Sequence, residues 1–153
     1  MKTINTIILS LAALAATACC NHSNNETTVA PPTPDSAQTS NATDCSIDLN
    51  NIEAQMLNNF KGGDGSVLMK MFQDGDNRVM LATIPAGASV GFHSHDNSLE
   101  VVYVLNGVAT ILYDSVEYTY TAGQAHYCAK GHSHSIANTT DSDLVTYNVV
   151  ATQ

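Results

Sequence analysis

Positive charge is scarce in this 153-residue chain, which has five Lys and Arg residues against fourteen acidic ones and a formal net charge of −9. Proteins that bind nucleic acids gain most of their affinity from Lys and Arg side chains that face phosphates. The basic residues beyond the N-terminus form no run; they are Lys61, Lys70, Arg78 and Lys130. The composition therefore argues against a nucleic-acid partner.

Several patterns of common protein classes are also missing. The chain has no alternation of strand and helix patterns, no internal repeat and no glycine-rich loop that could hold a phosphate. Beyond residue 20 it has only two cysteines, Cys45 and Cys128, which is too few for a disulfide framework. The two could pair outside the cytoplasm, or Cys128 could be a small buried side chain and Cys45 a bystander.

No apolar run is long enough to make a membrane span the natural interpretation. The run at residues 7–16 follows Lys2, is rich in alanine and ends in Ala16-Thr17-Ala18. A short apolar stretch with small residues before a cleavage point is typical of a secretory signal peptide, whereas a membrane helix needs about 20 apolar residues. We therefore predict a signal peptide over residues 1–18 and export from the cytoplasm, with a membrane anchor as the alternative.

Cys19 follows the predicted cleavage point and resembles the acylated cysteine of a bacterial lipoprotein. The usual motif has Leu three residues before the cysteine, where this chain has Ala16. Simple secretion is the alternative. We expect lipidation at Cys19, a location in the periplasm or at the outer membrane or cell surface, and membrane contact only through this lipid anchor.

The segment after Cys19 is expected to be a disordered tether over residues 19–44. It is polar and holds three of the four prolines of the chain, at positions 31, 32 and 34. The lead-in over residues 45–65 has Ile52, Met56 and Phe60 at a spacing of four, which favours one short helix. An irregular lead-in is the alternative.

Short β-type runs separated by turn residues fill residues 66–153, where we expect about nine strands. This spacing is typical of an all-β antiparallel sandwich or small barrel. Asn106-Gly107 predicts a type I′ hairpin that leads into the run at 108–113. A domain of this size buries a modest share of its surface, so a homodimer interface would add stability.

The stretch His93-Ser94-His95 and the nearby Glu100 are the most informative residues. Side chains at i and i+2 project from the same face of a strand, and Glu100 begins the next strand-like run. His134 is a fourth candidate. Three imidazoles and a carboxylate suit a divalent transition metal and leave positions open on an octahedral ion. The alternative is a set of histidines that hydrogen-bond at the rim of a barrel.

Both histidine segments belong to longer patterns that resemble the two motifs of the cupin superfamily. The first pattern comprises Gly87, His93, His95, Glu100 and Gly107, and the second comprises Gly123, Ala129, Gly131, His134 and Asn138. One position departs, since the family usually has Pro where this chain has Ala129. The resemblance implies a small single-domain cupin, in which residues 66–153 form one jelly-roll barrel of two antiparallel sheets.

The resemblance also implies that His93, His95, Glu100 and His134 are the metal ligands. Mn, Fe, Ni, Zn and Cu all accept this ligand set, so the identity of the metal stays open. His126 shares a strand face with Cys128, and it could support a ligand from behind or act as an acid or base. The alternative for His126 is a plain rim histidine, while His132 is expected in a turn at the surface.

The resemblance leaves two functions open, because cupins include both enzymes and binding modules. The first is an exported, lipid-anchored protein that binds a divalent transition metal and acts on a small polar molecule, as a metal-dependent oxidoreductase or a related lyase. No catalytic residue beyond the metal set can be assigned. The second is a non-catalytic module that binds a small ligand such as a carbohydrate or a metal ion.

Overall fold

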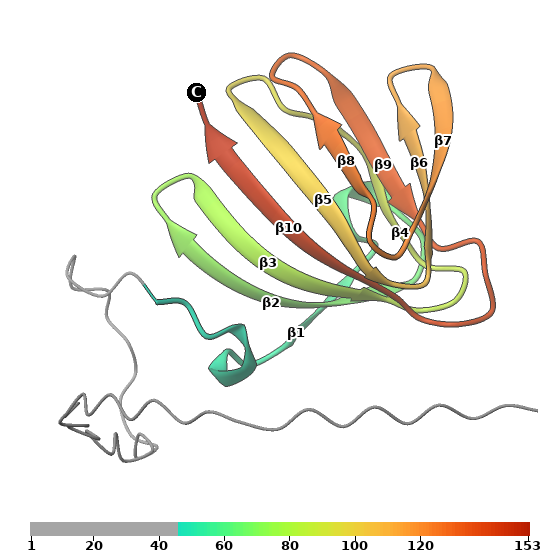
Figure 1. The fold of residues 1–153 in the computed structure, drawn as a ribbon, viewed down its shortest axis with the longest axis horizontal. Coiled ribbons are helices and arrows are strands. Elements are labelled where there is room, and N and C mark those ends of the chain that lie inside the picture. The colour runs from blue at the N-terminus through green and yellow to red at the C-terminus, as the bar shows by residue number, and fades with distance from the viewer. Residues whose placement is uncertain (1–45) are drawn as a thin grey trace, which may run out of the picture. The chain divides into compact units, whose positions relative to one another are not determined.

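A computed structural model describes residues 46–153, which form ten strands in two antiparallel sheets (Figure 1). The prediction of an all-β fold with two antiparallel sheets is confirmed. The predicted signal peptide, the tether, Cys19 and Cys45 lie outside the described residues. Within the described part, no helix is long and apolar enough to cross a membrane.

The larger sheet has six strands in the order β1-β2-β3-β10-β5-β8. The bounds of these strands are Gln55–Asn58 (β1), Ser66–Asp74 (β2), Asn77–Ile84 (β3), Leu144–Thr152 (β10), Ser98–Asn106 (β5) and Ala125–Cys128 (β8). The C-terminal strand β10 therefore lies in the middle of this sheet, where it pairs with β3 and β5.

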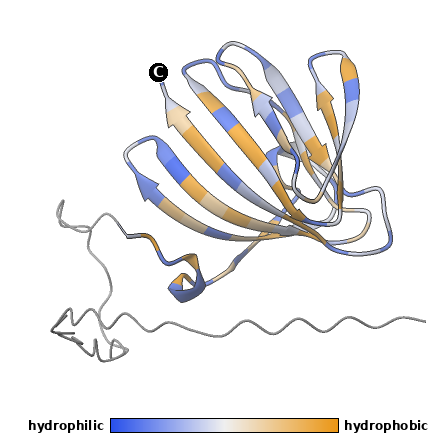
Figure 2. Cartoon of the chain, viewed as in Figure 1, coloured by the Kyte–Doolittle hydropathy of each residue, from blue (hydrophilic) through white to orange (hydrophobic). Residues whose placement is uncertain are grey.

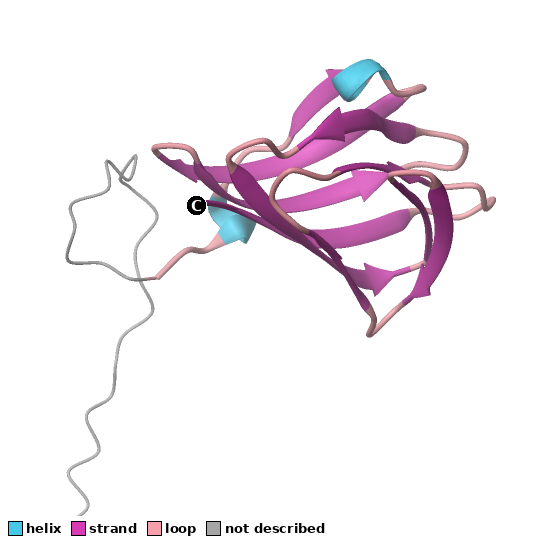
Figure 3. Ribbon diagram, turned by 90° about the horizontal axis from the view of Figure 1, so that it is seen from above, coloured by secondary structure: helices cyan, strands magenta, loops and turns pink. Residues whose placement is uncertain are grey.

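The smaller sheet has four strands in the order β4-β9-β6-β7. Their bounds are Ser89–Ser94 (β4), Ser133–Ala137 (β9), Val108–Tyr113 (β6) and Val116–Thr121 (β7). Seen from above, the two sheets curve around a common interior (Figure 3). Apolar and polar residues alternate along several strands (Figure 2), so that one face of each sheet is turned inward.

Most of the interior is aliphatic, but its polar part is concentrated in a few buried side chains. Val67, Ile84, Ile111, Ile136 and Leu144 are almost completely buried and anchor the core. The buried polar and charged residues are His95, Ser98, Glu100, His126, His134, Asn138, Thr146 and Asn148. A cluster of buried ionisable groups is costly unless the groups are paired or bind a ligand, so the four ionisable members of this set, His95, Glu100, His126 and His134, mark the functional region.

Register places Glu100 in one row with Arg78 and Gln73 across the inward face of the larger sheet. Cys128 pairs with Glu100, Glu100 with Val150, Val150 with Arg78 and Arg78 with Gln73. Directly opposed residues in antiparallel strands project from the same face, and neighbouring strands lie about 4.8 Å apart. Glu100 and Arg78 are therefore separated by one strand, with backbones about 10 Å apart.

Of the two alternatives for the lead-in, the short helix is wrong, and the described segment is irregular apart from one strand and two turns. Residues 55–58 form β1, which pairs with residues 66–69 of β2, and single 3-10 turns lie at Leu49–Asn51 (η1) and Phe60–Gly62 (η2). Met56 is 65% exposed, so the residues at a spacing of four do not share a buried face. Pairing with the edge of the sheet outweighs the weak helical periodicity of this short segment.

The predicted type I′ hairpin at Asn106-Gly107 is also wrong. Such a turn requires a positive φ at both residues, but Gly107 has a φ of +85° while Asn106 is not among the positive-φ residues. After Gly107 the chain passes from β5 in the larger sheet to β6 in the smaller one, where β6 pairs with β7 and β9. Asn106 and Gly107 do mark a change of chain direction, as predicted. Their local pattern does not determine, however, which strand pairs with β5.

Candidate metal centre and ligand cavity

The structure brings together the four side chains that were predicted to bind a metal. His93 lies on β4 directly opposite His134 on β9, His95 follows the end of β4, and Glu100 projects from β5 of the other sheet. Each residue offers a donor atom, and these atoms lie within 4.8 Å of one another. His95, Glu100 and His134 are buried and His93 is partly buried.

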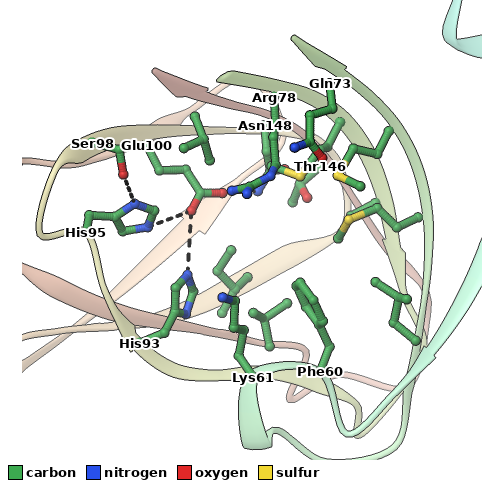
Figure 4. A pocket seen from close by; sticks show the side chains of 18 of the residues that line it. Phe60, Lys61, Gln73, Arg78, His93, His95, Ser98, Glu100, Thr146 and Asn148 are labelled. Atoms are coloured by element: carbon green, nitrogen blue, oxygen red, sulfur yellow. Dashed lines mark hydrogen bonds and ion pairs between the residues drawn. The ribbon is translucent and has the colours of Figure 1, made fainter. Parts of the chain in front are cut away.

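Glu100 is the centre of this cluster. Its Oε2 lies 3.0 Å from Nε2 of both His95 and His134 and 3.8 Å from Nε2 of His93. Figure 4 shows His93 and His95 approaching this carboxylate from one side of the cavity. Burial alone would raise the pKa of the Glu100 carboxyl, but its hydrogen bonds to His134, His93 and His95 outweigh burial and hold the pKa well below its usual value.

The outer nitrogens of two histidines are held by the protein. His93 Nδ1 lies 2.8 Å from the carbonyl oxygen of Gly91, and His95 Nδ1 lies 2.9 Å from Oγ of Ser98. A carbonyl oxygen only accepts hydrogen bonds, so His93 Nδ1 carries the proton and its Nε2 lone pair faces the cluster. This arrangement orients an imidazole for metal binding.

The donor set therefore fits a divalent transition metal. Imidazole nitrogens and one ionised carboxylate are typical ligands of Mn, Fe, Ni, Zn and Cu in proteins. Asn148 Nδ2 donates to Oε1 of Glu100 over 2.8 Å, which fixes the carboxylate with Oε2 toward the histidines. His93, His95, Glu100 and His134 would hold the ion.

A cavity of about 430 Å³ opens beside the cluster, which contributes His93, His95 and Glu100 to its wall. The opposite part of the wall is mainly apolar, with Phe60 and several methionines, but it also includes Lys61 and Arg78. The volume lies in the range of small-molecule sites, and it is far larger than a metal ion alone requires.

Three polar groups in the cavity wall are left without partners. Thr146 Oγ1 and Asn148 Oδ1 are buried and form no hydrogen bond. Among residues 46–153, no group forms a hydrogen bond or ion pair with the guanidinium of Arg78, which is partly exposed at the cavity wall and has five donors. Burying Thr146 Oγ1 and Asn148 Oδ1 without partners is unfavourable, so a polar ligand in the cavity would relieve both, and it would also meet the free donors of Arg78.

The spacing of histidines and acids revealed the metal cluster but gave no sign of Arg78, Ser98 or Asn148. Each of these residues reaches the site through strand pairing or a turn. Alternation along the run at 144–150 placed Asn148 on the buried face, and a buried amide among apolar residues was the one signal that could have identified it.

His126 and Cys128 share a face, as their parity on the strand predicted, and the structure shows that this face is the interior. The His126 ring lies against the His134 ring, with centroids 5.2 Å apart, and Tyr120 Oη lies 3.3 Å from His126 Nδ1. Burial, followed by the proximity of His134, lowers the pKa of His126 to about 4. Burial likewise raises the pKa of the Cys128 thiol to about 11.

His132 lies at the surface, as expected. Its Nδ1 is 2.7 Å from Oδ2 of Asp114, and both side chains are about half exposed. Cys128 is the one cysteine among the described residues and forms no disulfide within them. A pairing with Cys45 and a homodimer both stay predictions.

Comparison with known proteins gives a consistent picture. Residues 80–150 match the cupin domain. The oxalate-binding protein of Thermotoga maritima is 31% identical over 99 residues, which cover 61% of this chain and 82% of that protein.

Solved structures agree with this match. The crystal structure of a predicted oxalate decarboxylase from Thermotoga maritima has a TM-score of 0.66 and 27% identity, covering 71% of this chain and 99% of that one. The cupin domain of Schizosaccharomyces pombe Cnp3 has a TM-score of 0.59 at 14% identity, covering 71% of this chain and 74% of that one, and supports the fold alone.

Proposed function

Because this chain belongs to the cupin superfamily, we propose that it binds a divalent transition metal through His93, His95, Glu100 and His134, and that it captures a small carboxylate ligand at this metal. One observation carries the proposal: the metal cluster opens on a cavity whose wall also includes an unpaired Arg78. The metal, when bound, would supply coordination positions for ligand oxygens.

The cavity groups favour a carboxylate over a neutral ligand. Arg78 lies one strand beyond Glu100 in the same row, and a guanidinium binds carboxylates through two parallel hydrogen bonds. The Thr146 hydroxyl could donate a hydrogen bond to a further ligand oxygen, and Asn148 Oδ1 could accept a hydrogen bond from a ligand hydroxyl. The name of the Thermotoga maritima relative, an oxalate-binding protein, supports a ligand of this class.

Binding is favoured over turnover by what the cavity wall contains. Apart from the metal cluster, the only titratable side chains among its described lining residues are Lys61 and Arg78. No second carboxylate or free imidazole faces a ligand there to move protons. A metal-dependent oxidoreductase is the second candidate, because four protein ligands would leave about two positions of an octahedral ion for a substrate and dioxygen.

Calorimetric titration of oxalate into the full-length, Mn(II)-loaded protein tests the proposal, with product analysis of the same samples. We expect saturable oxalate binding and no consumption of oxalate. Consumption with formation of formate or carbon dioxide would establish an enzyme instead. Absence of binding, with glucose and other neutral sugars binding in its place, would contradict the carboxylate proposal.

The variant Arg78→Met tests the anchor directly. It keeps the apolar stem but removes the charged donors, so we expect the affinity for oxalate to fall by about 10-fold to 100-fold, as for the loss of a charge-assisted hydrogen bond. Lys70→Met is the matched control, because Lys70 Nζ bonds the carbonyl of Asn50 outside the cavity. Equal affinities for both variants and the wild type would contradict a role for Arg78.

We further propose that the protein is exported and anchored by a lipid on Cys19, on the strength of the apolar run and the small residues before this cysteine. In bacteria fed radioactive palmitate, we expect the wild-type protein to carry the label and to appear in the membrane fraction. The Cys19→Ser variant is expected to carry little or no label. Cys20→Ser is the control. Equal labelling of wild type and Cys19→Ser would contradict the anchor.

A further inference from the structure

A second group of metal-binding side chains lies behind His134, away from the ligand cavity. His126 and Cys128 project inward from β8, and their donor atoms lie within 4.8 Å of each other and of a donor atom of His134. All three residues are buried: His126 is 3% exposed, and Cys128 and His134 are fully covered. His126 and Cys128 do not line the cavity of the proposed metal centre.

Two nitrogens in this group are buried without a partner, namely His126 Nε2 and His134 Nδ1. The other nitrogen of each ring is already engaged, because His126 Nδ1 lies 3.3 Å from Tyr120 Oη and His134 Nε2 lies 3.0 Å from Glu100 Oε2. The remaining nitrogens are therefore free to bind a ligand. Leaving both unpaired in the interior costs about 1–3 kcal/mol each.

The ring spacing matches two imidazoles on one ion. The centroids of His126 and His134 lie 5.2 Å apart, with the ring planes inclined at 29°. Metal–nitrogen bonds of about 2 Å, with the donors spread around the ion, place two imidazole centroids roughly 5 Å apart. Little movement of either ring is therefore needed to close on an ion that Cys128 also reaches.

We propose that His126, Cys128 and His134 form a second metal site that is specific for Cu(I). The His134 ring would be shared between this site and the proposed metal centre beside the cavity, which we call the front centre. This site goes beyond the proposed function, which does not use His126 or Cys128. A thiolate with two imidazoles is a soft donor set that selects Cu(I) or Zn(II).

Coordination number and charge decide for Cu(I). Structural Zn(II) is almost always bound by four protein ligands, while this pocket offers three among the described residues. Cys128 is a thiol in the absence of an ion, and binding of the cation releases its proton to solvent. The resulting thiolate neutralises Cu(I), whereas Zn(II) would leave a net positive charge in a buried site, which is unfavourable.

Sharing of His134 keeps the charges matched when both sites are filled. To bind an ion at both nitrogens, the neutral ring would release its remaining N–H proton to solvent, and it would then be an imidazolate that carries one negative charge. A divalent ion at Glu100 and the imidazolate, together with Cu(I) and the Cys128 thiolate, then have no net charge. The buried region between the two sheets therefore holds both ions without an uncompensated charge.

The test uses the full-length chain with Cys19, Cys20 and Cys45 changed to serine, so that Cys128 is the sole thiol. This protein is titrated anaerobically with Cu(I) against a chromogenic chelator, and the product is examined by X-ray absorption spectroscopy. We expect about one tightly bound Cu(I) per chain, with one sulfur and two nitrogens around it and no bound water. Additional Cys128→Ser and His126→Phe substitutions are each expected to weaken Cu(I) binding by at least 100-fold.

His93→Ala in the same background separates this proposal from the proposed function. It removes a ligand of the front centre only, so Cu(I) binding with its copper–sulfur signal is expected to persist while Mn(II) binding fails. Circular dichroism establishes that each variant is folded; if Cys128→Ser is not, Cys128→Ala takes its place. Unchanged Cu(I) affinity in the Cys128 or His126 variants would overturn the site. A bound Cu(I) ion without a sulfur ligand would also overturn the site, and so would the absence of Cu(I) binding. In the latter case we would expect a crystal structure to show an ordered water between the two nitrogens.

Discussion

Replacing Glu100 by glutamine is expected to reduce bound divalent metal from about one ion per chain to a trace, a loss of affinity of at least 100-fold. The carboxylate is the only acidic side chain of the front centre, and its Oε2 faces all three histidines. Glutamine has nearly the same shape as glutamate, so the core stays packed. The loss of metal affinity is therefore caused by the missing charge and donor atom and not by a disturbed fold.

The hydrogen bond from Asn148 makes this substitution more damaging than the loss of charge alone. Asn148 Nδ2 donates to Oε1 of Glu100 over 2.8 Å, and in the variant it would select the carbonyl oxygen of Gln as its acceptor. The amide nitrogen of Gln would then face the histidines. A donor N–H offers no lone pair to a cation, so the variant presents the wrong group to the metal.

Elemental analysis and metal-induced shifts of the thermal midpoint measure the effect. The wild type is expected to gain thermal stability with added Mn(II), because an ion that binds only the folded state stabilises it, whereas Glu100→Gln is expected to gain almost none. Asp114→Asn is the matched control, since its carboxylate bonds His132 and Ser133 at the surface. A full complement of metal in Glu100→Gln would show that the four side chains are not a metal centre.

The chemistry of this cluster could be predicted from the sequence because local spacing encodes it. His93 and His95 are two positions apart, which places them on one side of an extended chain, and Glu100 begins the next strand. Alternation of apolar residues gave the strands in the same way. The meeting of the two halves of the motif, with His93 directly opposite His134, was implied by the resemblance to cupins and not by local spacing.

Long-range pairing could not be predicted in this way. Arg78 enters the cavity because β10, about 70 residues later in the chain, inserts between β3 and β5 and aligns Arg78 with Glu100 in one row. The wrong hairpin at Gly107 has the same cause, because β5 pairs with β8 and β10 rather than with β6. The lead-in differs, because β1 pairs with β2, the next strand in the chain, and this local pairing outweighs a weak helical periodicity.

Gly91→Ala is expected to lower the free energy of unfolding by about 3 kcal/mol or more, and the thermal midpoint by roughly 10–20 °C. Gly91 lies on β4 against η2, and a Cβ there would overlap the carbonyl oxygen of Lys61 and come within 2.5 Å of the Gly63 nitrogen and 2.6 Å of the Gly62 carbonyl carbon. All three obstacles are backbone atoms. Relief therefore requires β4 and η2 to separate.

That separation would also reach the metal centre. The carbonyl oxygen of Gly91 accepts the hydrogen bond that orients His93, and both Phe60 and Lys61 of η2 line the cavity. We therefore expect Gly91→Ala to weaken Mn(II) binding by at least 10-fold in the protein that remains folded, measured by calorimetry well below its thermal midpoint.

Gly123→Ala is a control that distinguishes the effect of close contact at Gly91 from the effect of backbone strain at a glycine. Gly123 has a φ of +89° and nothing within 4 Å of an added Cβ, so its substitution is expected to cost only about 1–2 kcal/mol and to leave Mn(II) affinity unchanged. Gly63→Ala meets the carbonyl of Ser89 and the nitrogen of Gly91 from the other side, and should match Gly91→Ala. If Gly91→Ala unfolds no more easily than Gly123→Ala, contact between β4 and η2 does not position His93.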